Sequence, residues 1–221
     1  MAGSLTNVIA RLYFDVQHAF GLVRLLDVDE EQSFPTYYSV ILLFTAALLL
    51  VAISAATRRV NGLHFGYWVG LAAIFLFLSI DEAVSIHELF TKPMRKLLRG
   101  SGGMLLFFAW IVPYAVVVLG IGIIYVRFLI KLPRRTAAFM VLSGALYLGG
   151  ALGVEMLSGW YFKSHGEHFD LGYYLLSALE EAFETMGTVL FVWTLLDYIE
   201  TTFGPLRLEM GNSARRLPTD T

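Results

Sequence analysis

Long apolar segments separated by short polar connections dominate the chain. Five of these segments can each form a helix of about 20 apolar residues, the length needed to cross the hydrocarbon core of a bilayer. They cover residues 36–56, 64–88, 104–129, 137–162 and 171–198. The pattern predicts an all-α fold: an integral membrane helical bundle of five transmembrane helices surrounded by the lipid bilayer.

The start of the chain follows a different pattern. Between residues 5 and 26, apolar positions recur at helical spacing on one face, whereas Arg11, His18 and Arg24 fall on the other. This arrangement predicts an N-terminal amphipathic helix that lies in the membrane interface. The chain is therefore expected to have three parts: an interfacial segment (1–35), the five-span bundle (36–200) and a polar C-terminal tail (201–221).

Composition supports a membrane protein and excludes several other classes. Of the 221 residues, 57% are hydrophobic and 15% are charged, against about 25% charged in average soluble domains. The net charge of −2 gives no indication of a nucleic-acid partner. Because the chain has no cysteine, it has neither disulfides nor a cysteine-ligated cofactor.

Three of the apolar segments carry acidic residues. A charge at the centre of a bilayer costs about 2.5–3.5 kcal/mol, so these groups are expected to face the bundle interior, find partners or stay protonated. Acids in such positions are functional candidates by default. They are Asp81, Glu82, Glu88, Glu155, Glu180, Glu181 and Glu184.

Depth and helical phase bring most of these acids together. Because successive spans alternate in direction, the acids of the second, fourth and fifth spans lie roughly 10–20 Å from the same membrane face. On an ideal helix Asp81, Ser85 and Glu88 share a face, with His87 about 120° away. A polar stripe on the fifth helix includes Ser177, Glu181, Glu184 and Thr188. We expect the second, fourth and fifth helices to enclose a polar core, with the first and third as an outer wall.

The fourth segment also carries small residues at a spacing of four. Ala145, Gly149 and Gly153 fall on the face opposite Glu155. Small residues at this spacing permit close contact between membrane helices. We therefore expect this stripe to be where a neighbouring helix packs.

Carboxylates on facing helices, together with a histidine, are suitable ligands for a divalent metal ion. A set dominated by oxygen favours Mg, Mn, Ca, Fe or Zn. The predicted ligands are Asp81, His87, Glu88, Glu155, Glu181 and Glu184. Additional candidates are Glu82, Glu180, His165, His168, Ser85 and Ser177. The Glu-x-x-His pairs of di-iron bundles do not occur.

Three alternatives to a metal-binding role stay open. The acids could translocate protons or cations, or a metal held by them could serve a membrane enzyme that acts on a lipid. They could also form a structural network in an accessory subunit that binds a membrane-protein partner or a second copy of the chain. No HExxH, GxSxG or phosphate-loop motif occurs, so the sequence does not decide whether the protein is an enzyme.

The strings LSIDEAVSIHE, LYLGGALGVEM and ALEEAFETMGTVLFVWTLLDYI together resemble a family of uncharacterised bacterial multi-pass membrane proteins. The resemblance runs from about residue 64 to residue 199. It implies a location in the bacterial inner (cytoplasmic) membrane and carries no activity with it.

Basic residues give a weak prediction of orientation. The membrane side opposite the N-terminus carries slightly more Lys and Arg, which favours that side as cytoplasmic. Its basic residues are Arg58, Arg59, Arg127, Lys131, Arg134, Arg135, Arg207, Arg215 and Arg216. The N-terminus is therefore expected outside and the C-terminus in the cytoplasm.

Overall fold

The computed structural model describes residues 34–59, 64–89, 93, 111–166 and 168–204, without the side chains of Glu88 and Val112. These residues form helices and no strand. Five helices are long and apolar enough to cross a membrane: Phe34–Arg59, Phe65–Val84, Pro113–Lys131, Arg134–Ser164 and Leu171–Phe203. The predicted five-span α-helical fold is confirmed. The predicted interfacial helix and most of the polar tail lie outside the described residues.

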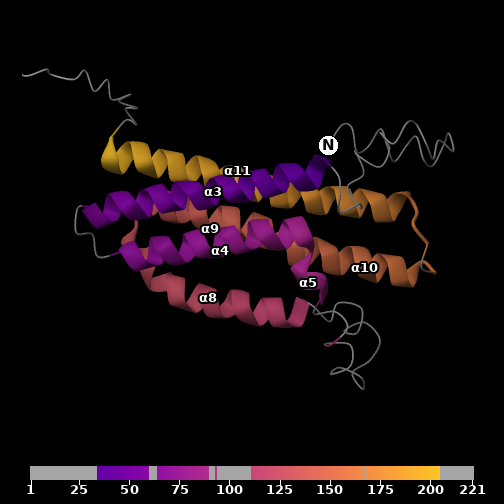
Figure 1. The fold of residues 1–221 in the computed structure, drawn as a ribbon. Helices are drawn as coiled ribbons and strands as arrows, with labels where there is room; N and C mark the ends of the chain where they lie inside the picture. The colour runs from indigo at the N-terminus through magenta and orange to yellow at the C-terminus, as the bar shows by residue number, and fades with distance from the viewer. Residues whose placement is uncertain (1–33, 60–63, 90–92, 94–110, 167, 205–221) are drawn as a thin grey trace, which may run out of the picture.

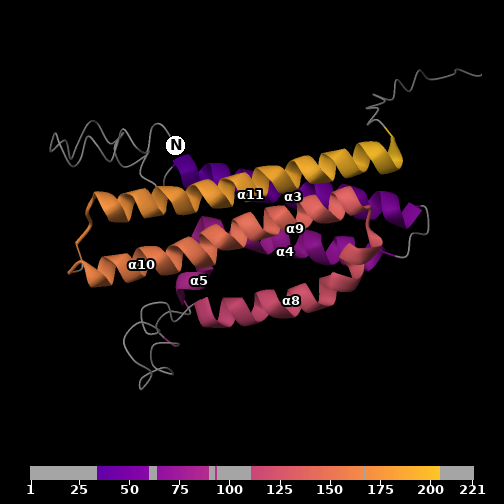
Figure 2. The same ribbon diagram turned by 180° about the vertical axis from the view of Figure 1, so that it is seen from behind.

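The long helices run side by side in alternating directions (Figures 1 and 2). They are α3 (Phe34–Arg59), α4 (Phe65–Val84), α8 (Ile111–Lys131), α9 (Arg134–Leu148) and α11 (Leu171–Phe203). A π-helical segment, η1 (Gly149–Val154), joins α9 to α10 (Glu155–Ser164), and the single turn α5 (Ile86–Leu89) comes after α4. Helix α3 packs along α4, and α11 packs along both α9 and α3.

The outer surface of the bundle is apolar along the helices. Large hydrophobic side chains such as Ile41, Phe77, Val116, Ile123 and Ile130 are exposed. In water such a surface would promote association, whereas in a bilayer the lipid chains cover it. This surface and the helix lengths place the bundle in a membrane.

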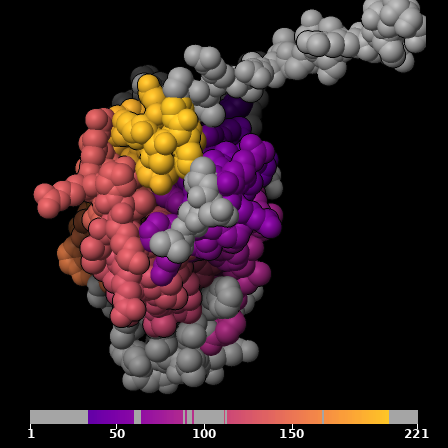
Figure 3. Space-filling model, turned by 90° about the vertical axis from the view of Figure 1, so that its left-hand side faces the viewer, coloured from indigo at the N-terminus to yellow at the C-terminus, as the bar shows by residue number. Residues whose placement is uncertain are grey.

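A tightly packed aromatic core closes one end of the bundle. Trp68 and Phe128 are buried and meet edge to face, with their ring centroids 5.0 Å apart. The ring of Tyr198 lies 4.9 Å from that of Trp68, and the hydroxyl of Tyr125 donates to the backbone oxygen of Tyr67 at 3.0 Å. Figure 3 shows this end from outside, where α3, α11 and the start of α9 pack together. The core fixes the C-terminal end of α8 to α4.

The second membrane helix ends earlier than predicted. Helix α4 stops at Val84, and Ser85 adopts a left-handed conformation with φ 51° and ψ 49°. Its N–H donates to the backbone oxygen of Asp81 at 2.7 Å, which closes the helix end. The expectation of one continuous helix to residue 88, with Ser85 and Glu88 on the face of Asp81, is therefore wrong.

The fourth membrane helix makes its close contact through a different glycine from the one predicted. A Cβ added to Gly150 would lie 2.8 Å from the backbone oxygen of Glu180, whereas one added to Gly153 would meet nothing within 4 Å. Ser143 and Tyr147 of α9 already lie against Gly187 of α11, and on a regular helix Gly150 shares their face, whereas Gly149 and Gly153 lie roughly 80–120° away. On α11 the matching small residue is Gly187, whose added Cβ would lie 2.7 Å from the backbone nitrogen of Tyr147.

Candidate functional site: an acid-lined cavity

A cavity of about 230 Å³ lies at the end of the bundle opposite the aromatic core. Its walls come from α4, α5, α8, α11 and the continuous α9–η1–α10 helix. Six carboxyl groups and one imidazole line it, and no Lys or Arg does so among the described residues. The titratable and hydroxyl-bearing residues of the wall are Asp81, Glu82, His87, Tyr114, Tyr147, Glu155, Glu180, Glu181 and Glu184.

Asp81 is the best-connected acid of the cavity. It is buried, with 6% of its surface exposed. Its Oδ1 accepts the backbone N–H of His87 at 2.8 Å, and its Oδ2 lies 3.3 Å from the Nδ1 of the same residue. The hydroxyl of Tyr114 lies 3.3 Å from both carboxylate oxygens. Asp81 therefore links α4 to α5 and to α8.

The helix break at Ser85 makes this arrangement possible. On a continuous helix, His87 would point about 120° away from Asp81. The left-handed turn at Ser85 instead folds α5 back, so that both the backbone N–H and the ring of His87 reach the Asp81 carboxylate. A non-glycine residue with positive φ is uncommon, and such residues cluster at functional sites.

Three other acids of the cavity lack such partners. The carboxylates of Glu82, Glu181 and Glu184 make no hydrogen bond or ion pair with any residue that the structure describes. The carboxyl group of Glu184 lies deep in the bundle. Like charges so close together in a poorly solvated space repel one another strongly. These groups therefore require protons or a positively charged ligand.

The structure brings together most of the predicted ligands. Asp81, His87, Glu155, Glu181 and Glu184 all line the cavity, as do the additional candidates Glu82 and Glu180. The side chain of Glu88 lies outside the described residues.

The other four additional candidates do not line the cavity. Ser177 is buried and Ser85 occupies the helix break, but neither belongs to the wall. His165 and His168 are exposed, and the Nδ1 of His165 lies 3.0 Å from the backbone oxygen of Tyr161. A role for these four residues at the site stays a prediction.

Two tyrosines in the wall were not predicted. Tyr114 comes from α8, so the expectation that the third membrane helix is only an outer wall is wrong. Tyr147 comes from the last turn of α9 and also lines a second cavity. The available signal was their position in the sequence, because each lies inside a predicted apolar segment (104–129 or 137–162) rather than at its edge, where membrane tyrosines usually occur.

The side chains of the cavity do not form a metal site as they stand. Among the residues that the structure describes, no group of three or more His, Asp or Glu is arranged to hold a metal ion. Ca²⁺ and Mg²⁺ take oxygen ligands at about 2.0–2.6 Å. Binding such an ion would therefore require rotation of several glutamate side chains toward one point.

Comparison with known families gives one match. The model of a family described as a domain of unknown function (DUF8692) matches residues 3–199. The chain belongs to this family. The DUF8692 match covers the first four membrane helices, the fifth as far as residue 199, and every acid of the cavity. No curated protein and no solved structure matches the chain.

Proposed function

We propose that this DUF8692 protein binds a cation in the acid-lined cavity, and that the cation is a divalent metal ion. The observation that carries the proposal is the wall itself, in which six carboxyl groups share about 230 Å³ with no Lys or Arg among the described residues. A divalent ion would offset their mutual repulsion directly. The oxygen-rich wall suits Mg, Mn, Ca, Fe or Zn.

Glu181 and Glu184, which make no hydrogen bond with any residue that the structure describes, are the groups best able to move toward an ion. Glu181 and Glu184 lie on one helix, and Glu155 faces them from α10. Asp81 is held by His87 and Tyr114, so it would act as the fixed member of the ligand set. His87 would be either a ligand or the partner that orients Asp81.

Metal analysis of detergent-purified protein tests this proposal. Wild type should contain a stoichiometric divalent metal ion and melt at a higher temperature when the metal is present. Glu155→Gln and Glu181→Gln should lose both properties. Glu200→Gln is the matched control, because Glu200 is exposed near the opposite end of α11. Wild-type protein without stoichiometric metal, and with a melting temperature unchanged by added metals, would overturn the proposal.

Protons are the competing occupants of the same carboxylates. Carboxylate ligands must be deprotonated to bind a metal, so metal affinity should fall as the pH is lowered. A metal content unchanged between pH 8 and pH 5 would show that groups other than these carboxylates bind the ion.

Complete translocation of protons or cations has less support than binding. Beyond Glu184 the inward face of α11 continues with Gly187, Thr188 and Phe191, which line an apolar cavity. In the described part of the chain, the acids thus reach from one membrane face to mid-depth only. If translocation does occur, pH-driven flux in liposomes should disappear in Glu155→Gln and Glu181→Gln.

We further propose a bacterial inner-membrane location with the C-terminus in the cytoplasm. Basic side chains gather at the end of the bundle away from the acid-lined cavity, and the positive-inside rule places such an end in the cytoplasm. In the described part of the chain they are Arg58, Arg59, Arg127, Lys131, Arg134 and Arg135. The cavity would then face the outer side of the membrane.

A further inference from the structure

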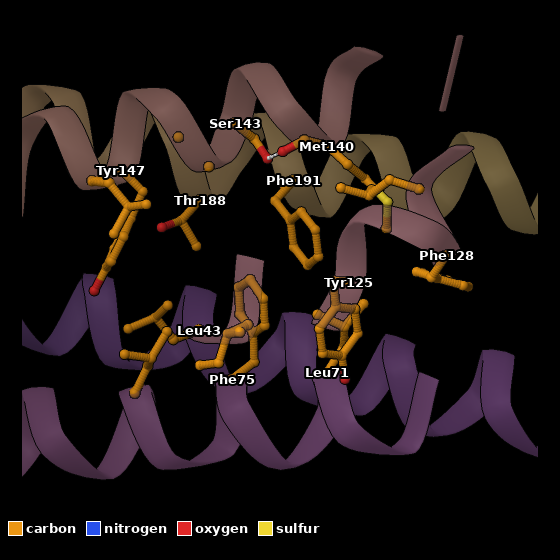
Figure 4. Close-up of a pocket in the computed structure, with 16 residues that line it drawn as sticks. Leu43, Leu71, Phe75, Tyr125, Phe128, Met140, Ser143, Tyr147, Thr188 and Phe191 are labelled. Carbon is orange, nitrogen blue, oxygen red and sulfur yellow. Dashed lines mark hydrogen bonds between the residues drawn. The ribbon is translucent and has the colours of Figure 1, made fainter. Parts of the chain in front are cut away.

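A second cavity adjoins the acid-lined one and is almost entirely apolar. It has a volume of about 190 Å³, and its wall includes Leu43, Phe75, Phe128 and Phe191. Figure 4 shows Tyr147 at one end of this cavity and Phe128 at the other, with Phe75 and Phe191 between them. The rings of Phe75 and Phe191 stack with their centroids 4.3 Å apart.

Apart from the hydroxyl of Tyr147 at one end, the hydroxyl groups in this apolar cavity already donate to backbone oxygens. Ser143 donates to the backbone oxygen of Met140 at 3.0 Å, and Thr188 donates to that of Glu184 at 2.9 Å. Tyr125 donates to a backbone oxygen of α4. A ligand would therefore meet hydrocarbon here rather than hydrogen-bonding groups.

The two cavities are neighbours along α8. They share Leu78, Tyr147 and Leu148 as wall residues. One stripe of α8 lines both in order, with Tyr114 and Val118 in the acid-lined cavity and Ile121, Tyr125 and Phe128 in the apolar one. Neither volume alone reaches the roughly 300 Å³ at which small-molecule pockets begin, whereas the two together exceed it.

Tyr147 stands where the two cavities meet. Its hydroxyl makes no hydrogen bond with any residue that the structure describes. Nearby on the acidic side is the carboxyl group of Glu184, which also lacks a hydrogen-bond partner among the described residues. The junction thus offers two polar groups, with no hydrogen bond to any described residue, to a ligand that extends from one cavity to the other.

We propose that the joined cavities bind an amphipathic cation, with a single alkyl chain in the apolar cavity and an amine head group among the carboxylates. Charge complementarity selects the head group, because the same carboxylates would repel a carboxylate or phosphate head. Volume limits the chain: a cavity of about 150 Å³ accommodates benzene, so this one suits a chain of roughly eight carbons. This inference rests on the proposed cation site and names a class of ligand for it.

Three chain-matched probes test the selection of charge. Binding of labelled octylamine, octanol and octanoate is measured by equilibrium dialysis against the purified protein in detergent at neutral pH. Octylamine should bind saturably, at least ten-fold more tightly than octanol, and octanoate should not bind. Equal binding of all three probes would overturn the proposal, because the carboxylates would then play no part.

Matched glycine variants test the position of the chain. A Cβ on Gly144, which lines the apolar cavity, or on Gly122 of α8, which does not, would meet nothing within 4 Å. Gly144→Leu should therefore fill the cavity and weaken octylamine binding at least ten-fold, whereas Gly122→Leu should leave it unchanged. Ile121→Phe fills the same cavity from α8 and should act like Gly144→Leu. Unchanged octylamine binding in both filled variants would overturn the proposal.

A metal-binding assay distinguishes failure of the proposed ligand class from failure of the proposed cation site. Gly144→Leu leaves the carboxylates intact, so it should retain Mn²⁺ binding, which also shows that the variant is folded. Glu184→Gln should weaken both Mn²⁺ and octylamine, and Mn²⁺ should displace octylamine from wild type. Wild type that binds Mn²⁺ but not octylamine would refute the ligand class alone. Wild type that binds neither would refute the proposed function as well.

Discussion

Ser85 carries the most unusual backbone conformation of the site. It is the only non-glycine residue with positive φ among those that the structure describes. A left-handed conformation costs an L-residue roughly 1–2 kcal/mol, a cost that glycine avoids. The strain is compensated locally, because the turn allows Asp81 to accept the N–H of His87.

Replacing Ser85 should therefore alter stability in a characteristic way. Ser85→Gly should raise the free energy of unfolding by about 1 kcal/mol, and Ser85→Val should lower it, since a β-branched residue fits positive φ poorly. Denaturant unfolding in detergent measures both. Ser177→Gly is the control: within a helix the same change should destabilise by roughly 0.5–1 kcal/mol. Destabilisation by Ser85→Gly would show that its hydroxyl has a role beyond the turn.

At the residue level, the sequence identifies the acids but not their partners. Acidic residues within apolar segments are recognisable because they are costly in a bilayer. That His87 and Tyr114 reach Asp81 depends on a left-handed turn and on the position of α8, and neither is encoded in helical periodicity. The side chains were identified by residue type, whereas their contacts required the tertiary structure.

At the level of elements, the contact between α9 and α11 depends on the absence of a side chain at Gly187. An added Cβ would lie 2.7 Å from the backbone nitrogen of Tyr147 and 2.8 Å from the backbone oxygen of Ser143. Backbone atoms cannot move aside as a flexible side chain can, so the two helices would have to separate.

Gly187→Ala should destabilise the protein by about 1–3 kcal/mol, the usual cost of overpacking. Gly144→Ala, on the opposing helix, has open space at its Cβ and should be neutral or stabilising by up to about 1 kcal/mol. Thermal melts of both variants in one detergent provide the comparison. Equal melting temperatures for the two would contradict this account of the contact.

Asp170 shows how the turn before α11 is stabilised. Its side chain caps that helix by accepting the N–H of Tyr173 at 3.0 Å, and it also accepts the hydroxyl of Tyr161 at 3.0 Å. These hydrogen bonds favour the charged form, the backbone N–H most strongly, and hold the pKa of Asp170 below its ordinary value of 3.8. A lowered pKa contributes stability above pH 4 that is lost as the pH falls through the folded-state pKa.

Asp170→Asn should therefore reduce the acid sensitivity of the protein. The asparagine retains a capping oxygen but does not titrate, so its melting temperature should fall less than that of wild type between pH 5 and pH 3. Asp170→Ala removes the cap and should melt at a lower temperature across the neutral range. Parallel pH profiles for wild type and Asp170→Asn would show that Asp170 does not titrate with folding.

The sequence predicts the helices better than their internal irregularities. Apolar runs of about 20 residues are a strong signal, because in a bilayer every backbone polar group must bond within its own helix. The π-helical segment η1 has no comparable signal. The prediction placed the close contact on Gly149 and Gly153 from residue size and spacing alone, whereas Gly150, on the face of Ser143 and Tyr147, makes it.

At the scale of the whole molecule, the described bundle has an acidic end, which holds the cavity, and a basic end. The acid-lined cavity lies toward the end where α3 and α11 begin, and the aromatic core and the described Arg side chains lie toward the other. Arg135 illustrates the basic end: its Nη2 lies 3.1 Å from the Asp197 carboxylate and its guanidinium lies over Trp193. Sequence alone indicated this polarity only weakly, because the total numbers of basic residues on the two sides are similar.

Single-cysteine labelling should determine which end faces the cytoplasm. The chain has no cysteine, so each introduced thiol reports one position. His168 lies exposed at the acidic end, and Thr202 lies exposed at the basic end. If the basic end is cytoplasmic, a membrane-impermeant maleimide should label His168→Cys in intact cells and Thr202→Cys only after permeabilisation. The reverse pattern would place the acid-lined cavity toward the cytoplasm, and with it the side from which a cation enters.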